Sequence, residues 1–183
     1  MKARLISIKG NWTDVKNSCM VTVSKEYTEK EPDSSWRKKI LLAEHSPIRQ
    51  ILIKCKLEEL KSWISVHFIR HKIGIEHWVR SQRTDRTMIN RDELKQSELI
   101  EHEFEANCQA FINISRKRLC NIAARETREA WKEVLEKIKD EQPELYSVCV
   151  PDCIYRGWCY EMKSCNYYIT DEYKKKLNEY RKN

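Results

Sequence analysis

The sequence has few of the residues that loosen a chain, with three glycines and four prolines in 183 residues. This composition argues against long disordered linkers. No apolar run approaches the roughly 20 residues that a membrane-spanning helix needs, and the apolar stretch near the first residue is too short for a secretory signal. We find no internal repeat, so we expect one domain, or one domain with a small appendix, in the cytoplasm.

Charged residues and cysteines are abundant instead. Lysine and arginine number 35 against 28 aspartates and glutamates, which gives a net charge of +7. This excess favours anionic partners such as phosphate groups, a nucleic acid or an acidic surface. In a cytoplasmic protein the eight cysteines are expected to be thiols or metal ligands rather than disulfides.

The first half of the chain is expected to form strands and short helices. Runs of β-branched residues predict strands within residues 2–28, separated by a glycine–asparagine turn signal. A short helix is expected to follow Asp33, one of three candidate N-caps, and to end before Pro47. Alternating apolar residues at 51–57 predict a half-buried strand.

The second half is expected to be mostly helical. The apolar spacing from Leu60 predicts a helix that ends near an Arg-His-Lys sequence, and residues 72–97 have no clear period, which predicts a long functional loop. Helical spacing resumes at Glu101, and a further amphipathic helix contains Trp131. Strands first and helices later favour an α+β fold, with a mixed or antiparallel sheet and long helices.

The segment HFIRHKIGIEHWVRSQRTDRT, residues 67–87, has three histidines and five lysines or arginines interleaved with apolar side chains. Arg70, His71 and Lys72 fall at the predicted helix end, where they can form charge-assisted hydrogen bonds to phosphate groups. A solvated basic loop is the alternative. His77 and, outside the segment, His102 are expected at the surface.

Five short motifs follow one another along the chain, namely His-Ser-Pro at 45–47, Arg-His-Lys at 70–72, Ser-Gln-Arg at 81–83, Arg-x-x-Leu at 91–94, and the set Asn107, Asn113 and Arg118. Their order and spacing resemble the signature of the flavin-dependent thymidylate synthases, the ThyX family, over roughly residues 44–131. The resemblance implies an α+β, ThyX-like domain that assembles as a homotetramer with its sites between subunits.

The resemblance also implies an activity. The family transfers a one-carbon unit from methylenetetrahydrofolate to C5 of dUMP in dTMP biosynthesis, with FAD as relay and hydride donor and NADPH as reductant. The implied partners are a pyrimidine nucleotide and further copies of the chain, with no membrane and no nucleic acid.

The resemblance assigns a role to each matching residue. The residues implied to hold FAD are Ser46, Arg70, His71, Lys72, Asn107 and Asn113. The residues implied to hold dUMP are His67, Ser81, Arg83, Arg91 and Arg118. Arg118 is also the implied catalytic residue, because a fixed cation against the uracil favours ionisation of N3 and makes C5 a better nucleophile.

The chain departs from the family pattern at several positions. Lys72 replaces an arginine and loses its fork geometry. Thr84 stands where the family has tyrosine, and the family's Asn-Glu pair is missing, with His77 as a candidate replacement for the asparagine. Two alternatives therefore stay open: a related pyrimidine-nucleotide enzyme such as a hydroxymethylase, or a basic zinc-containing protein that binds nucleic acid.

The C-terminal part is rich in cysteine. Four thiols fall within seventeen residues, a density typical of structural zinc sites although no Cys-x-x-Cys pair is present, and the candidate ligands are Cys149, Cys153, Cys159 and Cys165. Cys120 is an alternative to Cys149, and buried or merely abundant cysteines are the alternative to a metal site. We expect residues 1–145 to form the ThyX-like domain and residues 146–183 a Cys-rich tail packed on it.

Overall fold

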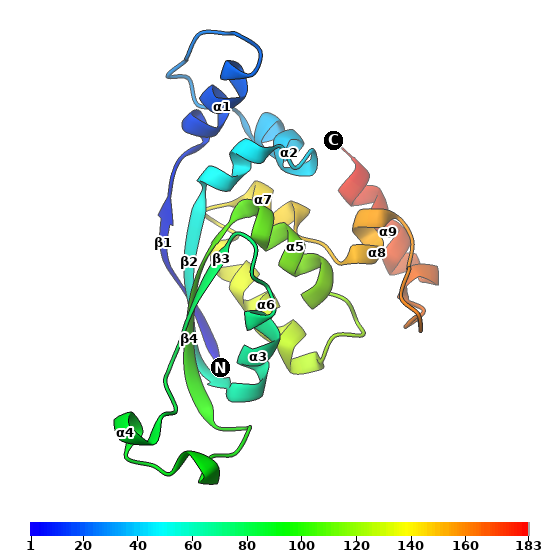
Figure 1. The fold of residues 1–183 in the computed structure, drawn as a ribbon. Helices are drawn as coiled ribbons and strands as arrows, with labels where there is room; N and C mark the ends of the chain where they lie inside the picture. Colours follow the sequence, from blue (N-terminus) through cyan, green and yellow to red (C-terminus); the bar gives the residue numbers. More distant parts are fainter. Residues whose placement is uncertain (183) are drawn as a thin grey trace.

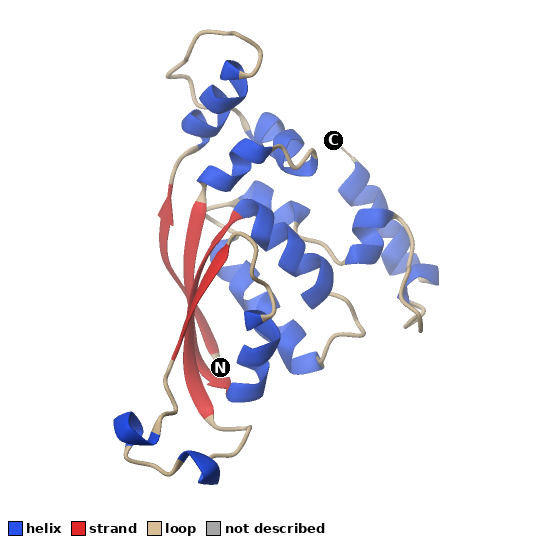
Figure 2. Ribbon diagram, viewed as in Figure 1, coloured by secondary structure: helices blue, strands red, loops and turns tan. Residues whose placement is uncertain are grey.

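The computed structural model describes residues 1–182. One four-stranded sheet forms one layer, and the helices lie against one side of it and beyond its ends (Figures 1 and 2). The strands are β1 (Lys2–Lys9), β2 (Leu52–Lys61), β3 (Ile75–Val79) and β4 (Leu99–Asn107). The longer helices are α1 (Trp12–Val21), α2 (Ser34–Leu42), α3 (Ser62–Ile69), α5 (Cys108–Arg118), α6 (Arg125–Ile138) and α9 (Asp171–Arg181). The short helical elements are η1 (Ser46–Gln50), α4 (Thr84–Thr87), η2 (Arg91–Glu93), α7 (Pro143–Val148), α8 (Asp152–Arg156) and η3 (Tyr167–Ile169).

The sheet has the strand order β1-β2-β4-β3, and every neighbouring pair is antiparallel. The α+β class and the antiparallel sheet are therefore confirmed. On β2 and β4 the residues that face the helices are buried, because alternate side chains point to one face of a strand, and these residues include Ile53, Cys55, Phe104 and Ala106. They pack on α5 and α6, where Phe111 and Trp131 are fully buried.

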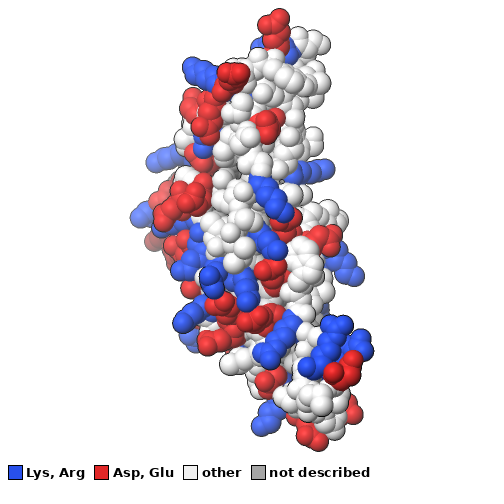
Figure 3. Space-filling model, turned by 90° about the vertical axis from the view of Figure 1, so that its left-hand side faces the viewer, with Lys and Arg blue, Asp and Glu red and all other residues white. Residues whose placement is uncertain are grey.

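The opposite face of the sheet carries basic and acidic side chains close to one another (Figure 3). Three of the ion pairs among them join neighbouring strands, namely Lys54–Glu103, Lys56–Glu101 and Arg4–Glu58, and the fourth, Lys9–Glu105, reaches from β1 across β2 to β4. Each exposed pair adds little stability. Together they let β2 and β4 expose one face to water while burying the other.

Two predictions for the first half are confirmed and one is wrong. The strand expected at 51–57 is β2, and the helix after Asp33 is α2, whose first turn is capped by the Asp33 carboxylate. The strands expected within residues 2–28 stop after β1, because the chain continues as the helix α1.

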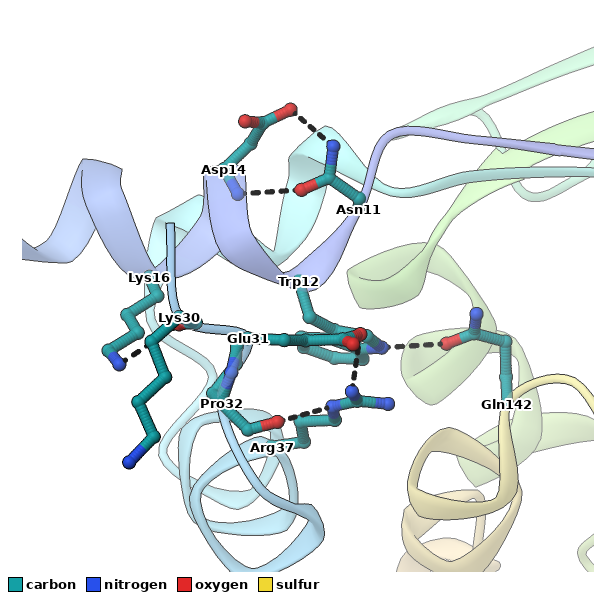
Figure 4. Close-up of polar contacts among 9 residues, drawn as sticks. All are labelled: Asn11, Trp12, Asp14, Lys16, Lys30, Glu31, Pro32, Arg37 and Gln142. Atoms are coloured by element: carbon teal, nitrogen blue, oxygen red, sulfur yellow. Dashed lines mark hydrogen bonds and ion pairs between the residues drawn. The ribbon is translucent and has the colours of Figure 1, made fainter. Parts of the chain in front are cut away.

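The helix α1 forms because its capping and packing outweigh the β-branched run. Asn11 caps it by accepting a hydrogen bond from the backbone N–H of Asp14 at 2.8 Å. Trp12 is buried, and its indole N–H donates to Gln142, just before α7, at 3.2 Å (Figure 4). A further clamp on the same side joins Arg37 of α2 to Glu31 and to the Pro32 carbonyl.

The second half brings two confirmations and two corrections, and the first confirmation is α3, the helix expected from Leu60 to the Arg-His-Lys sequence. The amphipathic helix that contains Trp131 is α6, with Thr127, Trp131 and Val134 on its buried face. The helix expected from Glu101 begins only at Cys108, because residues up to Asn107 form the strand β4. The loop expected at 72–97 contains the edge strand β3. No described helix has the length and apolar character needed to cross a membrane.

Candidate functional site

The predicted Arg-His-Lys motif does follow a helix end. Helix α3 ends at Ile69, Arg70 is its C-cap, and the backbone N–H of His71 donates to the carbonyl of Phe68 at 2.9 Å. Arg70 and Lys72 are exposed, whereas His71 is half-buried. The turn at residues 70–74 therefore presents two cations to solvent on either side of an imidazole that faces the protein.

Arg118, the last residue of α5, reaches this turn from a distant part of the sequence. Its Nε–H donates to Nε2 of His71 at 2.9 Å, and its other guanidinium arm donates to the carbonyl of His67. His67 in turn pairs through Nδ1 with the hydroxyl of Thr127 on α6 at 2.8 Å. Three residues implied by the resemblance thus meet between α3 and α5.

This cluster is cationic, and no carboxylate in the described part of the chain neutralises it. Within residues 1–182 no ion pair involves Arg70, Lys72 or Arg118. Burial and then the charge of Arg70 lower the pKa of Arg118. Burial and then the charge of Arg118 lower the pKa of His71 to about 4, so His71 is neutral at physiological pH. A half-buried, unpaired arginine beside a neutral histidine is suited to bind an anion.

Asn107 fixes the start of α5 against the same turn. The Asn107 side-chain oxygen caps α5 by accepting a hydrogen bond from the backbone N–H of Ala110 at 2.9 Å. The backbone N–H of Asn107 donates to the carbonyl of Gly74 at 2.9 Å. Gly74 has φ +72°, and a Cβ there would lie 2.5 Å from the Asn107 amide. Only glycine fits, so Asn107 and Arg118 hold the turn from the two ends of α5.

Asn113 and Ser46 lie apart from this cluster. The side-chain amide oxygen of Asn113 accepts hydrogen bonds from the side chains of Gln109 and Arg116. Both of those side chains also donate to the Glu44 carboxylate. Ser46 is exposed at the start of η1, which packs on α5. Both residues thus sit beside α5, and neither is hydrogen-bonded to His71 or Arg118 in the part of the chain described.

Ser81, Arg83 and Arg91 belong to a separate excursion between β3 and β4, which contains α4 and lies beyond the end of the sheet (Figure 1). Ser81 accepts from the backbone N–H of Arg83, and Arg83 pairs with Asp85 at 2.7 Å. Among the described residues no hydrogen bond or ion pair joins this excursion group to His67, the 70–72 motif or Arg118. The implied dUMP residues therefore form two groups in one chain.

Sequence reasoning missed a hydrogen-bonded histidine chain next to the turn. The surface positions expected for His77 and His102 are wrong: His77 is half-buried and His102 has no exposed surface. His77 joins His102 on one side and the carbonyl of His71 on the other, each at 2.9 Å, and His102 reaches Ser65 at 3.0 Å. The three histidines in eleven residues at 67–77 were the available signal.

The pKa of His102 makes stability depend on pH. Burial, and then the charge of His77, lower it from 6.5 to about 4. Since the unfolded state binds the proton more readily, His102 contributes its full stability above pH 6.5 and loses it as the pH falls toward 4. We expect a loss of about 3 kcal/mol from this residue, measured by urea unfolding across that range. A His102→Gln variant should lose less over the same range, and an identical pH slope would contradict this origin.

The cysteines divide into a core group and a cavity group. Cys149 is buried in the core, and burial raises its pKa to about 12. Cys120, Cys153, Cys159 and Cys165 line a cavity of about 820 Å³ between α5, α6 and the C-terminal helices, although Cys149 also touches it. Within residues 1–182 no three His, Cys, Asp or Glu side chains are grouped closely enough to hold a metal ion. Burial and, to a smaller extent, the nearby Glu161, Cys165 and Cys159 raise the pKa of Cys120, so Cys120 lies near two of the tail thiols, whereas Cys149 belongs to the core.

Comparisons with known proteins establish the fold. No protein-family model matches the chain, and no curated protein matches it in sequence. Among solved structures, the flavin-dependent thymidylate synthase ThyX of Helicobacter pylori, complexed with FAD and dUMP, superposes with a TM-score of 0.71 at 12% identity, over 82% of this chain and 100% of that chain. A UMP/dUMP methylase, PolB of Streptomyces cacaoi, bound with 5-Br dUMP, superposes with a TM-score of 0.65 at 10% identity, over 80% of this chain and 93% of that chain.

The α+β fold of this chain is thus one that is also found in enzymes that modify nucleotides. More particularly, it is the fold of the flavin-dependent thymidylate synthases, which confirms at the level of the fold the resemblance drawn from the motifs.

Proposed function

We propose that this chain is a flavin-dependent enzyme that acts on dUMP or a closely related pyrimidine nucleotide. The observation that carries the proposal is Arg118: it is half-buried, bonded to His71 and His67, and without a carboxylate partner among the described residues. The shared fold with proteins that bind FAD and dUMP supports the same conclusion.

The residues present fit the two ligands. Arg70 and Lys72 are exposed cations on one turn and would hold the FAD phosphates, with His71 contributing an N–H between them. Asn107 lies against the same turn, whereas Asn113 on α5 and Ser46 on η1 lie apart from it and would meet a more distant part of the cofactor. When bound, FAD would supply hydride and one-carbon transfer chemistry. Arg118 would face the uracil and stabilise negative charge at N3, which increases the nucleophilicity of C5.

The specific reaction is dTMP formation, with methylenetetrahydrofolate as one-carbon donor and NADPH as reductant. The dUMP site is completed by a neighbouring copy of the chain, which supplies Ser81, Arg83 and Arg91. These residues make no described hydrogen bond or ion pair with Arg118 of their own chain. A homotetramer with sites between subunits accounts for this division.

A hydroxymethylase is the second candidate, and one observation favours it. The residues that stand where the family has its Asn-Glu pair form the strand β3, in which the His77 side chain is engaged with His71 and His102. Mass spectrometry of the nucleotide product distinguishes a methyl from a hydroxymethyl group at C5.

An absorption spectrum tests the proposed function first. We expect the purified protein, after addition of FAD, to retain the bound flavin through gel filtration and to show a spectral shift on titration with dUMP. Titration with dCMP is the matched control and should leave the spectrum unchanged. A protein that binds neither FAD nor dUMP would share the fold without the chemistry.

A structural zinc ion in the C-terminal part is a separate proposal, supported by the cavity group of thiols. The ligands would be Cys120, Cys153, Cys159 and Cys165, drawn together by the ion into a tetrahedral set. We expect about one zinc per chain by elemental analysis, lost in Cys120→Ser but retained in Cys149→Ser and in the control Cys19→Ser. Retention in Cys120→Ser with loss in Cys149→Ser would restore the ligand set expected from sequence.

A further inference from the structure

A chain of hydrogen bonds connects the sheet to the turn at residues 70–74. It begins at Ser65 on α3, whose hydroxyl lies 3.0 Å from Nδ1 of His102 on β4. The Nε2 atom of His102 lies 2.9 Å from Nδ1 of His77 on β3. The Nε2 atom of His77 lies 2.9 Å from the backbone carbonyl of His71. Ser65 and His102 are buried, so the bond between them is shielded from bulk solvent.

The carbonyl at the end of the chain fixes the proton on every ring. A carbonyl can only accept, so Nε2 of His77 must carry a hydrogen. In neutral His77 the Nδ1 atom is then an acceptor, and it receives a hydrogen bond from Nε2–H of His102. Nδ1 of His102 is consequently an acceptor as well, and it receives the hydroxyl proton of Ser65. The His71 carbonyl thus sets the tautomer of His77, and His102 and Ser65 donate in turn to complete the chain.

The other side of the turn is fixed by Arg118. Its guanidinium donates to Nε2 of His71, which leaves the His71 proton on Nδ1. His71 is therefore held twice, through its backbone carbonyl by His77 and through its ring by Arg118. These two bonds come from opposite sides, one from the sheet and one from α5, and together they determine where the His71 ring points.

We infer that His77 is a positioning residue for the ligand-binding turn: its Nε2–H bond to the His71 carbonyl, supported by the donors His102 and Ser65 behind it, orients His71 for flavin binding, a role that rests on the proposed function. Both ring nitrogens of His77 are engaged within the protein, by His102 and by the His71 carbonyl. His77 therefore acts through the backbone of His71, which would touch the ligand.

Nitrogen-15 NMR of the imidazole rings tests the proton positions without any ligand. Near neutral pH we expect His77 and His102 in the Nε2–H form and His71 in the Nδ1–H form. In Ser65→Ala, His102 loses the hydroxyl donor at Nδ1, and we expect the His77 signals to shift although the two residues are not in contact. His77 in the Nδ1–H form would overturn the inference whether or not the protein binds flavin.

Two amide substitutions of His77 separate its two hydrogen bonds. Glutamine places an N–H near the position of Nε2 and can reach the His71 carbonyl, whereas asparagine places its polar atoms near Nδ1 and can reach only His102. We expect His77→Gln to keep FAD affinity within about threefold, and His77→Asn and His77→Phe to weaken it by about tenfold. Trp78→Phe is the matched control. Trp78 follows His77 in β3, but its side chain points to the other face of the sheet, where its ring packs against the Lys54 ammonium group.

The outcomes of the binding experiment are distinct. Equal affinities for the glutamine and asparagine variants, with unfolding midpoints like that of the wild type, would overturn the positioning role. If the wild-type protein bound no FAD, the proposed function would fail, and the NMR result alone would decide the hydrogen-bond chain.

Discussion

Replacement of Arg118 by alanine is expected to lower the turnover of dUMP by about 100-fold or more, because it removes the cation that would face the uracil. FAD affinity should change by less than about tenfold, since Arg70, Lys72 and the His77 bond to the His71 carbonyl remain. Single-turnover product formation and the visible flavin spectrum measure the two effects separately.

Two further variants make this experiment specific to Arg118. Lys117→Ala removes an adjacent cation that is exposed and lies 3.8 Å from Asp152, so turnover should remain that of the wild type. Arg118→Lys keeps the charge but not the two-armed contact with His71 and His67, so it should recover only part of the activity. Full activity in Arg118→Ala would exclude the assigned role.

Mixing two inactive variants is expected to restore activity. In the proposed oligomer each site takes Arg118 from one chain and Arg91 from its neighbour. Arg118→Ala and Arg91→Ala chains assembled together therefore create some sites with both arginines intact. Random pairing leaves about one quarter of the sites complete, so the mixture should reach up to about a quarter of wild-type turnover.

The controls for this complementation are the two variants assayed alone and a mixture of the wild type with a chain that carries both substitutions. Different affinity tags on the two chains establish that mixed oligomers have formed. If mixed oligomers form and the mixture is no more active than the mean of its components, Arg91 and Arg118 do not serve one shared site.

Secondary structure could be predicted best from the sequence where a single physical signal determined it. The alternation of Ile53, Cys55 and Leu57 leaves no other way to bury those side chains, and β2 follows. The strand β4 was missed because its buried residues, Ile100, His102, Phe104 and Ala106, include a histidine. A hydropathy pattern counts histidine as polar, so the alternation of buried side chains is interrupted in the sequence. The burial of His102 depends on hydrogen bonds from β3 and α3, which are distant in sequence.

The site was predictable in its components and not in its assembly. The motif order singled out His71, Asn107 and Arg118, and the structure brings these three to one turn. No local pattern could show that the segment with Arg83 would form an excursion separate from Arg118. Nor could spacing show that Cys149 packs in the core while Cys120 joins the tail cysteines, since that depends on where α5 ends relative to α8.

The paired charges on the open face of the sheet have a consequence for how ligands arrive. Four cations there are matched by four carboxylates, so the net charge of +7 is carried by the rest of the chain. Arg70, Lys72 and Arg118 have no such partners among the described residues and contribute to that excess. The dianionic nucleotide proposed as the substrate would therefore find its net attraction away from the open face of the sheet, and its association rate is expected to fall as ionic strength rises.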